Sequence, residues 1–311
     1  MNKILALDPL AIESYIDWLK FQPYVGQNKG LFMANFPRHW VSEFIKNELD
    51  TKDWGFYDTI KIKEFLISQE SNNTFVSLNS TYDKKIKWGK NYNNVPNANK
   101  IDCIPIASRS DNNGLRTFED LQPEEELFID STKSEGLTPN GLLQCCKLFF
   151  QNSSKIAFVD RHNYLLTAGG ELSTFTSFIQ GLLKIIKDPK KCHAILIYSK
   201  YDPEKYPYMK SNDALYQQLS KVFGGHTTPT YGIKYMCCQE SSKNEDLHAR
   251  KIVTNHVVFN LQDSISGHTR SQSITRVADK NFREKNIKSW IDEDHGLDVI
   301  SSATYIDLVQ Y

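Results

Sequence analysis

The second half of the chain alternates regularly between short apolar runs and amphipathic stretches. Apolar runs at 156–160, 192–198, 233–238 and 257–261 are bounded by polar segments, which is the pattern of buried β-strands. Between the first three runs, the stretches 173–187 and 211–223 place their apolar residues on one helical face. Each stretch is long enough for the crossover that parallel strands require. We therefore predict an α/β fold over 151–311, with helices flanking a mainly parallel mixed sheet and the first three strands parallel.

The first 150 residues have a less regular pattern. Apolar positions at helical spacing predict short helices at 12–19 and 39–49, whereas alternating or apolar runs predict strands at 60–63, 74–78, 101–106 and 126–130. The stretch 91–100 is rich in Asn and predicts a loop. We expect residues 1–150 to form an α+β region that precedes the second domain, and no motif assigns this region a role.

Composition narrows the class of protein. The 311 residues include 37 basic and 37 acidic side chains, so nucleic-acid binding would need a local basic patch rather than an overall positive field. The N-terminus is interrupted by charge too early for a signal peptide, and no apolar stretch reaches the roughly twenty residues of a membrane span. Six cysteines without a C-x-x-C motif favour reduced thiols. We expect a cytoplasmic protein with no membrane span, bound metal or cofactor.

The most informative segment is 247–255, where His248 and Arg250 stand two positions apart in a run with the pattern of a β-strand. In a strand, side chains at i and i+2 point to the same face. A guanidinium matches the oxygens of a phosphoryl group, and an imidazole can attack phosphorus or move a proton. The pair therefore predicts a phosphate site. The alternative is that Arg250 pairs with Glu245 or Asp246 at a sheet edge.

This segment resembles the single-motif, phospholipase D-like proteins, whose signature is His-x-Lys, or His-x-Arg in truncated branches. His248 matches the histidine and Arg250 replaces the lysine, while Asn255 stands where the family has an acid. The family's Gly-Ser pair would fall near Gln262 and Asp263. The resemblance covers about 156–262 by the order of elements, and it implies a phospholipase D-like α/β domain. Proteins of this kind occur in bacterial defence and toxin systems.

The resemblance implies roles for residues around this motif. His248 would be the nucleophile, Arg250 would stabilise the developing charge, and Asp160 or Asp263 would orient the imidazole. Further candidates lie in polar segments. These are the substrate-binding residues Asn255, Asp263 and Ser264 and a possible acid, His268. Asp160 could equally be a turn-forming acid at a strand end, and the 264–273 stretch an exposed Ser-rich loop.

Three functions remain open. The first is a phosphodiesterase or nuclease with a histidine nucleophile, acting on a nucleic acid or a phospholipid without a cofactor. Because such sites pair two histidine motifs and this chain has one outside the polar loop, an active enzyme would be a homodimer or would use His268 as its acid. The second is a catalytically inactive phosphate-binding or assembly module of a multi-protein complex, which the departures at Asn255, Gln262 and Asp263 favour. The third is an ordinary interaction protein.

Overall fold

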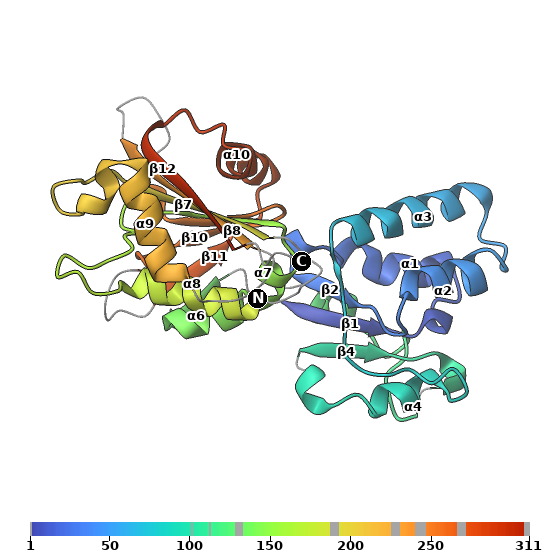
Figure 1. Cartoon of the computed structure of the whole chain (residues 1–311). Coiled ribbons are helices and arrows are strands. Elements are labelled where there is room, and N and C mark those ends of the chain that lie inside the picture. The colour runs from blue at the N-terminus through green and yellow to red at the C-terminus, as the bar shows by residue number, and fades with distance from the viewer. Residues whose placement is uncertain are drawn as a thin grey trace. The chain divides into compact units, whose positions relative to one another are not determined.

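The computed structural model describes residues 2–100, 102–111, 113–127, 133–186, 193–224, 231–239, 247–265 and 272–307. The chain divides into two compact units, an N-terminal unit of residues 2–130 and a C-terminal unit of residues 131–311 (Figure 1). The boundary lies before the expected position at residue 150, because β5 (Lys133–Leu137), α6 (Pro139–Cys145) and α7 (Lys147–Gln151) belong to the second unit.

The N-terminal unit is built on a parallel sheet. Its described strands are β1 (Lys3–Leu7), β2 (Leu31–Ala34), β3 (Phe75–Val76) and β4 (Cys103–Ile106), and they lie in the order β3-β2-β1-β4. All three strand pairings are parallel. This corrects the expectation of an α+β region, since every connection between neighbouring strands crosses over through helices. The chain runs from β1 to one side of the sheet and then returns to place β4 on the other side of β1.

Helices cover both faces of this sheet (Figure 1). They are α1 (Tyr15–Phe21), α2 (Trp40–Phe44) with the following π-helix (Ile45–Leu49), α3 (Phe56–Ser71), α4 (Trp88–Asn93) and α5 (Pro123–Glu126). Leu5, Leu7 and Met33 of the strands form one buried cluster with Trp40 and Phe44. The helices predicted at 12–19 and 39–49 and the strands at 74–78 and 101–106 are confirmed, with shifted ends.

Three predictions in this unit are wrong. The stretch 60–63 lies inside α3, where Ile62 and Leu66 are buried one helical turn apart. The predicted loop 91–100 begins within α4. Glu126 ends α5 instead of starting a strand, and residues 128–130 lie outside the described residues.

The C-terminal unit contains a mixed sheet of eight described strands in the order β12-β8-β7-β6-β9-β10-β11-β5. Besides β5, these are β6 (Lys155–Val159), β7 (His193–Lys200), β8 (Tyr231–Gln239), β9 (Lys251–Thr254), β10 (Val258–Leu261), β11 (Gln272–Arg276) and β12 (Asp298–Asp307). β6, β7 and β8 are parallel, as predicted, and the remaining pairings are antiparallel. The predicted α/β fold with a mixed sheet flanked by helices is therefore confirmed.

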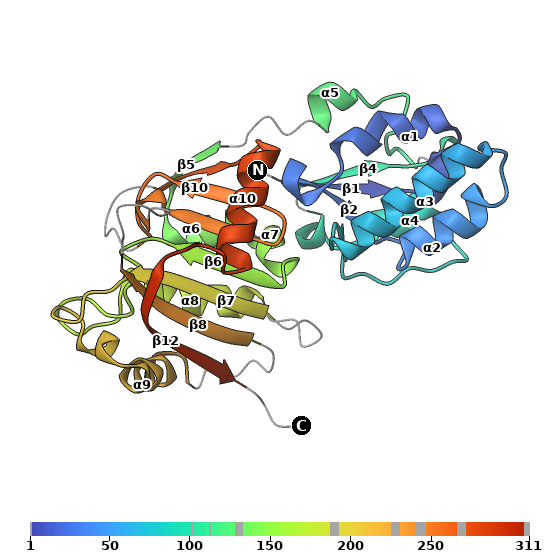
Figure 2. The same ribbon diagram turned by 90° about the horizontal axis from the view of Figure 1, so that it is seen from above.

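Helices pack on both faces of this sheet as well (Figure 2). They include α8 (Thr174–Ile185), α9 (Asn212–Phe223) and α10 (Lys280–Ile291), and the short 3-10 helix η8 (Leu247–Ala249) precedes β9. Successive residues of β6 point to opposite faces. Phe158 contacts Phe175 and Phe178 of α8, whereas Val159 belongs to the buried cluster that contains Trp290 of α10. This alternation fixes the sheet between two helical layers. None of the described helices is long and apolar enough to span a membrane.

Candidate functional site

The strand register of the C-terminal unit brings Asp160 and Arg250 to the same edge of the sheet. β6 and β9 are antiparallel, and Val159 pairs with Lys251. Asp160, which follows Val159, and Arg250, which precedes Lys251, therefore lie beside each other at the carboxyl end of β6. Ligands of α/β sheets bind outside the carboxyl ends of the parallel strands. The sequence-predicted pairing of Asp160 with the His248 segment is thus consistent with the position of both in the fold.

Main-chain hydrogen bonds fix the segments at this edge. The N–H of Asp160 donates to the carbonyl of Tyr198 in β7, and the N–H of Arg161 donates to the carbonyl of Leu247 at 3.1 Å. The carbonyl of Arg161 accepts from the N–H of Lys200. The residues after β6 are therefore held between the end of β7 and η8, which carries His248.

The side chains of Arg161 and His248 are in direct contact. Nη1 of Arg161 lies 3.2 Å from Nδ1 of the imidazole and also contacts Nε2. A guanidinium has only donors, so the ring nitrogen that accepts must present a lone pair. The contact places an imidazole lone pair beside a fixed positive charge.

Several polar atoms at this edge are buried without a hydrogen-bond partner. Asp160 is 2% exposed; its Oδ1 accepts from the N–H of His162, but its Oδ2 has no partner in the part of the chain that the structure describes. The Nε–H groups of Arg161 and Arg250 are also shielded from water, and no described residue accepts from them. A buried donor without an acceptor costs about 1–3 kcal/mol. The two guanidinium groups therefore offer donors that an added anion would satisfy.

Arg250 has an unusual backbone conformation. Its φ is +35°, in the left-handed region of backbone conformation that residues other than glycine rarely adopt. Nη1 of Arg250 donates to the carbonyl of Gln262 at 2.8 Å, which ties the side chain to the end of β10. Residues held in such conformations cost about 1–3 kcal/mol and cluster at functional sites.

The pKa of His162 reports the electrostatic environment of this edge. Burial lowers the pKa of His162 below its ordinary value. The carboxylate of Asp160 raises it, while the electrostatic interactions with Arg161, Arg250 and His248 lower it further. These five residues therefore share one electrostatic environment, and we call them the edge cluster: Asp160, Arg161, His162, His248 and Arg250.

The edge cluster differs from the predicted His-x-Arg strand face. His248 lies in η8, and Arg250 precedes β9 with a positive φ, so their side chains do not alternate as in a strand. The predicted strand begins only at Lys251. The segment therefore presents its imidazole from a tight helical turn, and the contact to Arg161 replaces the expected i, i+2 arrangement.

Four other candidates fall in different places. Asn255 lies beyond the far end of β9, where its Oδ1 accepts from Ser154 Oγ and from the N–H of Lys155 at 2.7 Å. It caps the start of β6, at the other end of the sheet from His248. Asp263 and Ser264 follow β10 at the same edge as Arg250. His268 lies outside the described residues.

Arg161 and His162 were not assigned roles from the sequence, although the strand-end run Asp160-Arg161-His162 contained a signal for them. Strand-end charges beside a predicted phosphate motif are the residues that a parallel sheet brings together. Among the described residues, no group of three or more His, Cys, Asp or Glu side chains is placed to hold a metal ion. No protein-family model and no curated protein matches the chain.

Proposed function

We propose that the C-terminal unit binds a phosphate ester at the edge cluster. The observation that carries this proposal is the pair of buried Nε–H groups of Arg161 and Arg250, which have no hydrogen-bond partner among the described residues and lie near the imidazoles of His162 and His248. Guanidinium groups bind phosphate oxygens through directed hydrogen bonds, and these are stronger where water is excluded. The carboxylate of Asp160 limits the net positive charge and orients the loop through the N–H of His162.

A bound phosphate group would supply the hydrogen-bond acceptors that the edge cluster lacks among the described residues. Its oxygens would accept from Nε of Arg161 and of Arg250, so two buried donors would gain charged partners. Each hydrogen bond of this kind contributes about 1.5–3 kcal/mol. The chain has no overall positive charge, so affinity would come from these local contacts and would fall with salt only in proportion to the few phosphates contacted.

Phosphodiester hydrolysis is a second candidate, and the contact between Arg161 and His248 favours it. A ring nitrogen of His248 that presents a lone pair could form a bond to phosphorus while the bond from phosphorus to the leaving oxygen breaks. The leaving oxygen would take a proton from an acid. Water would then attack the phosphohistidine and release the second product. His268, or a second copy of the chain related by a two-fold axis, would supply the acid.

Binding and hydrolysis are tested separately with the full chain. Fluorescence anisotropy with a labelled single-stranded oligonucleotide, and flotation with vesicles containing phosphatidic acid, measure binding to the two classes of phosphate ester. Release of nitrophenol from bis(4-nitrophenyl) phosphate measures turnover, and light scattering gives the oligomeric state. We expect Arg161→Ala and Arg250→Ala each to weaken binding by about 10-fold or more.

Lys184→Ala is the matched control. Lys184 is an exposed cation in the last turn of α8, near the start of β7 and therefore at the opposite end of the sheet. Its removal should leave binding unchanged. Equal losses in the Lys184 and Arg161 variants would contradict a local site. If binding persists in His248→Ala but turnover disappears, the enzyme interpretation holds; if the wild-type chain binds without turnover, the binding module holds.

A further inference from the structure

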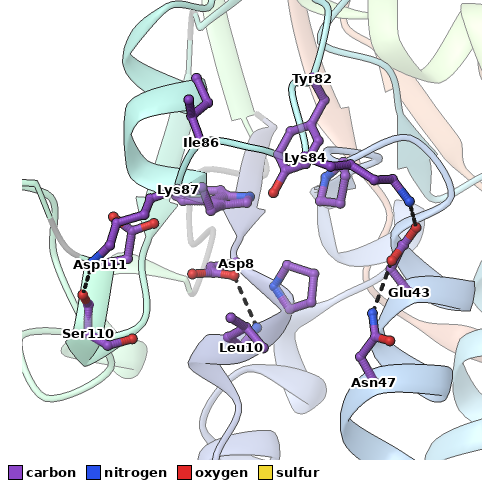
Figure 3. A pocket seen from close by; sticks show the side chains of 13 residues that line it. Asp8, Leu10, Glu43, Asn47, Tyr82, Lys84, Ile86, Lys87, Ser110 and Asp111 are labelled. Carbon is purple, nitrogen blue, oxygen red and sulfur yellow. Dashed lines mark hydrogen bonds and ion pairs between the residues drawn. The ribbon is translucent and has the colours of Figure 1, made fainter.

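The N-terminal unit contains a pocket at the point where its sheet topology reverses. The chain runs from β1 through β2 to β3 on one side and returns to β4 on the other side of β1. In parallel sheets the loops after such a strand pair diverge and leave a crevice in which ligands bind. A pocket of about 400 Å³ lies there, lined by residues that follow β1 and β4 and by residues of the segments 37–47 and 82–88 (Figure 3). Its size is that of a small organic molecule.

Two buried carboxylates form the polar part of the pocket. Asp8, directly after β1, is 2% exposed and accepts from the N–H groups of Leu10 and Ser108. Asp111, after β4, is 8% exposed and accepts from the N–H of Gly89 and from Asn113 Nδ2. In the described part of the chain, neither carboxylate forms an ion pair. Their charge is therefore balanced only by neutral donors.

The two lysines of the pocket are held at its rim. Lys84 Nζ forms an ion pair with Glu43 at 2.6 Å, and Lys87 Nζ donates to the carbonyl of Ser110 at 2.7 Å. Figure 3 shows these contacts on opposite sides of the pocket, with Asp8 between them. Lys84 is thus neutralised by Glu43, while Lys87 remains close to the loop that carries Asp111. The lining retains one more acidic than basic side chain.

Burial and nearby charges raise the pKa values of two groups in the pocket, Asp8 and Tyr82. Burial raises the pKa of Asp8, and the charge of Asp111 raises it further, although three hydrogen bonds oppose the shift. Burial also raises the pKa of Tyr82 to about 12, and the negative charges of Asp8, Asp111 and Glu43 add to that effect. The negative charges of Asp8, Asp111 and Glu43 therefore all act on Tyr82.

We propose that this pocket binds a small alkylammonium ligand, whose cationic nitrogen lies between Asp8 and Asp111. Five further lining residues are apolar and suit a short hydrocarbon chain: Pro9, Leu10, Pro37, Ile86 and Trp88. A buried carboxylate is expensive unless a cation pairs with it, so an ammonium group supplies the missing partner. A bare divalent ion fits less well, because the pocket is far larger than one hydrated ion and the described residues contain no three-ligand metal group.

Titration calorimetry on the full chain tests the ligand class with putrescine and its neutral analogue 1,4-butanediol. Putrescine should bind, and 1,4-butanediol, with the same chain but no charge, should not. Asp8→Asn and Asp111→Asn should each weaken putrescine binding by about 10-fold or more. Glu70→Gln removes an exposed charge near the end of α3, outside the pocket, and should leave the affinity unchanged. Arms with butylguanidine, which carries a guanidinium and no amine, and with manganese chloride separate a guanidinium and a metal ion from an amine.

A second variant avoids the buried positions. Leu10 is 49% exposed and lines the pocket, so Leu10→Lys should fold normally and place a tethered ammonium beside Asp8. It should abolish putrescine binding by occupying its site. Putrescine binding that survives in Leu10→Lys would overturn the proposal. So would equal affinity for 1,4-butanediol, binding of manganese without any amine, or no heat with putrescine.

Discussion

Arg161 and His248, which are 87 positions apart in the chain, meet side chain to side chain at the carboxyl end of β6. Arg161 belongs to the loop after the parallel strand β6, and His248 belongs to the 3-10 helix η8 before the antiparallel strand β9. Their contact joins two segments whose backbones are already fixed by the bond from Arg161 N–H to the Leu247 carbonyl. A preorganised pair of this kind can bind an anion without rearranging first.

The first prediction concerns the titration of His162. Its pKa is lowered by burial and by the electrostatic interactions with Arg161, Arg250 and His248, and raised by Asp160. Arg161→Gln should therefore raise the pKa of His162, and Asp160→Asn should lower it further. A bound phosphate adds negative charge and should raise it, so phosphate-ester affinity should increase as pH falls through the pKa of His162. Imidazole resonances followed by NMR across a pH series measure these shifts.

His256 provides an internal control for this titration. Burial alone lowers the pKa of His256, and it lies beyond β9 at the other end of the sheet from the edge cluster. Its titration should be unchanged in both variants and on adding the oligonucleotide. Parallel shifts of His162 and His256 would indicate a general change of structure and would contradict the electrostatic assignment.

The second prediction separates backbone strain from binding at Arg250. With φ at +35°, any residue with a Cβ is strained there, whereas glycine is not. Arg250→Gly should be more stable to urea than Arg250→Ala by up to about 1 kcal/mol, since the strain of about 1–2 kcal/mol is partly offset by the entropy of glycine. Both variants should lose phosphate-ester binding. At Arg161, which has no positive φ, the alanine variant should be the more stable one.

The third prediction concerns Lys251, which the i, i+2 pattern would place on the strand face away from the phosphate site. Its side chain is buried; Nζ donates to Asn286 Oδ1 at 2.6 Å and lies 5.3 Å from the ring centre of Phe282. Lys251→Ala should destabilise the protein by about 1–3 kcal/mol, because Asn286 loses a charged partner and α10 loses a contact. Chemical denaturation measures this loss. A double-mutant cycle with Asn286→Ala should show coupling, and strict additivity would contradict the contact.

The regular part of the fold could be predicted from the sequence because its periodicity is long and unambiguous. α8 shows this, with Phe175, Phe178, Leu182 and Leu183 all buried. The stretch Ile60–Lys63 was misread because four alternating residues fit a strand as well as one turn of a helix. Only the burial of Ile62 and Leu66 on one face of α3 separates the two.

The sites depend on contacts that no local pattern contains. The position of Asn255 follows from the antiparallel register of β9, which directs it away from Asp160. Likewise, the N–H of Ser108 reaches Asp8 across 100 positions, because the return crossover places β4 next to β1. The sequence did contain one signal, an acidic residue directly after an apolar strand. Asp8 follows the strand Lys3–Leu7 in this way, as Asp160 follows β6. Strand-end acids could therefore indicate both sites, but the order of the strands in each sheet determines which residues lie beside them.

The last prediction concerns Gly89 in α4, whose N–H donates to Asp111 Oδ2. A Cβ at Gly89 would lie 2.7 Å from the main-chain oxygen of Asp111, which is too close for any contact and cannot be relieved by rotating a side chain. Gly89→Ala should therefore shift the loop after β4. Overpacking costs about 1–3 kcal/mol, and the better helix propensity of alanine returns about 1 kcal/mol. We expect a net loss of about 1 kcal/mol in urea denaturation and a weaker putrescine affinity.

The matched control is Gly169→Ala in the C-terminal unit. There the nearest atom to an added Cβ is Thr167 Oγ1 at 3.7 Å, an ordinary van der Waals distance. This substitution should leave stability within about 0.5 kcal/mol of wild type and should not change putrescine binding. If Gly89→Ala retained full stability and full putrescine affinity, the close packing of α4 against Asp111 would not be what holds that carboxylate in the pocket.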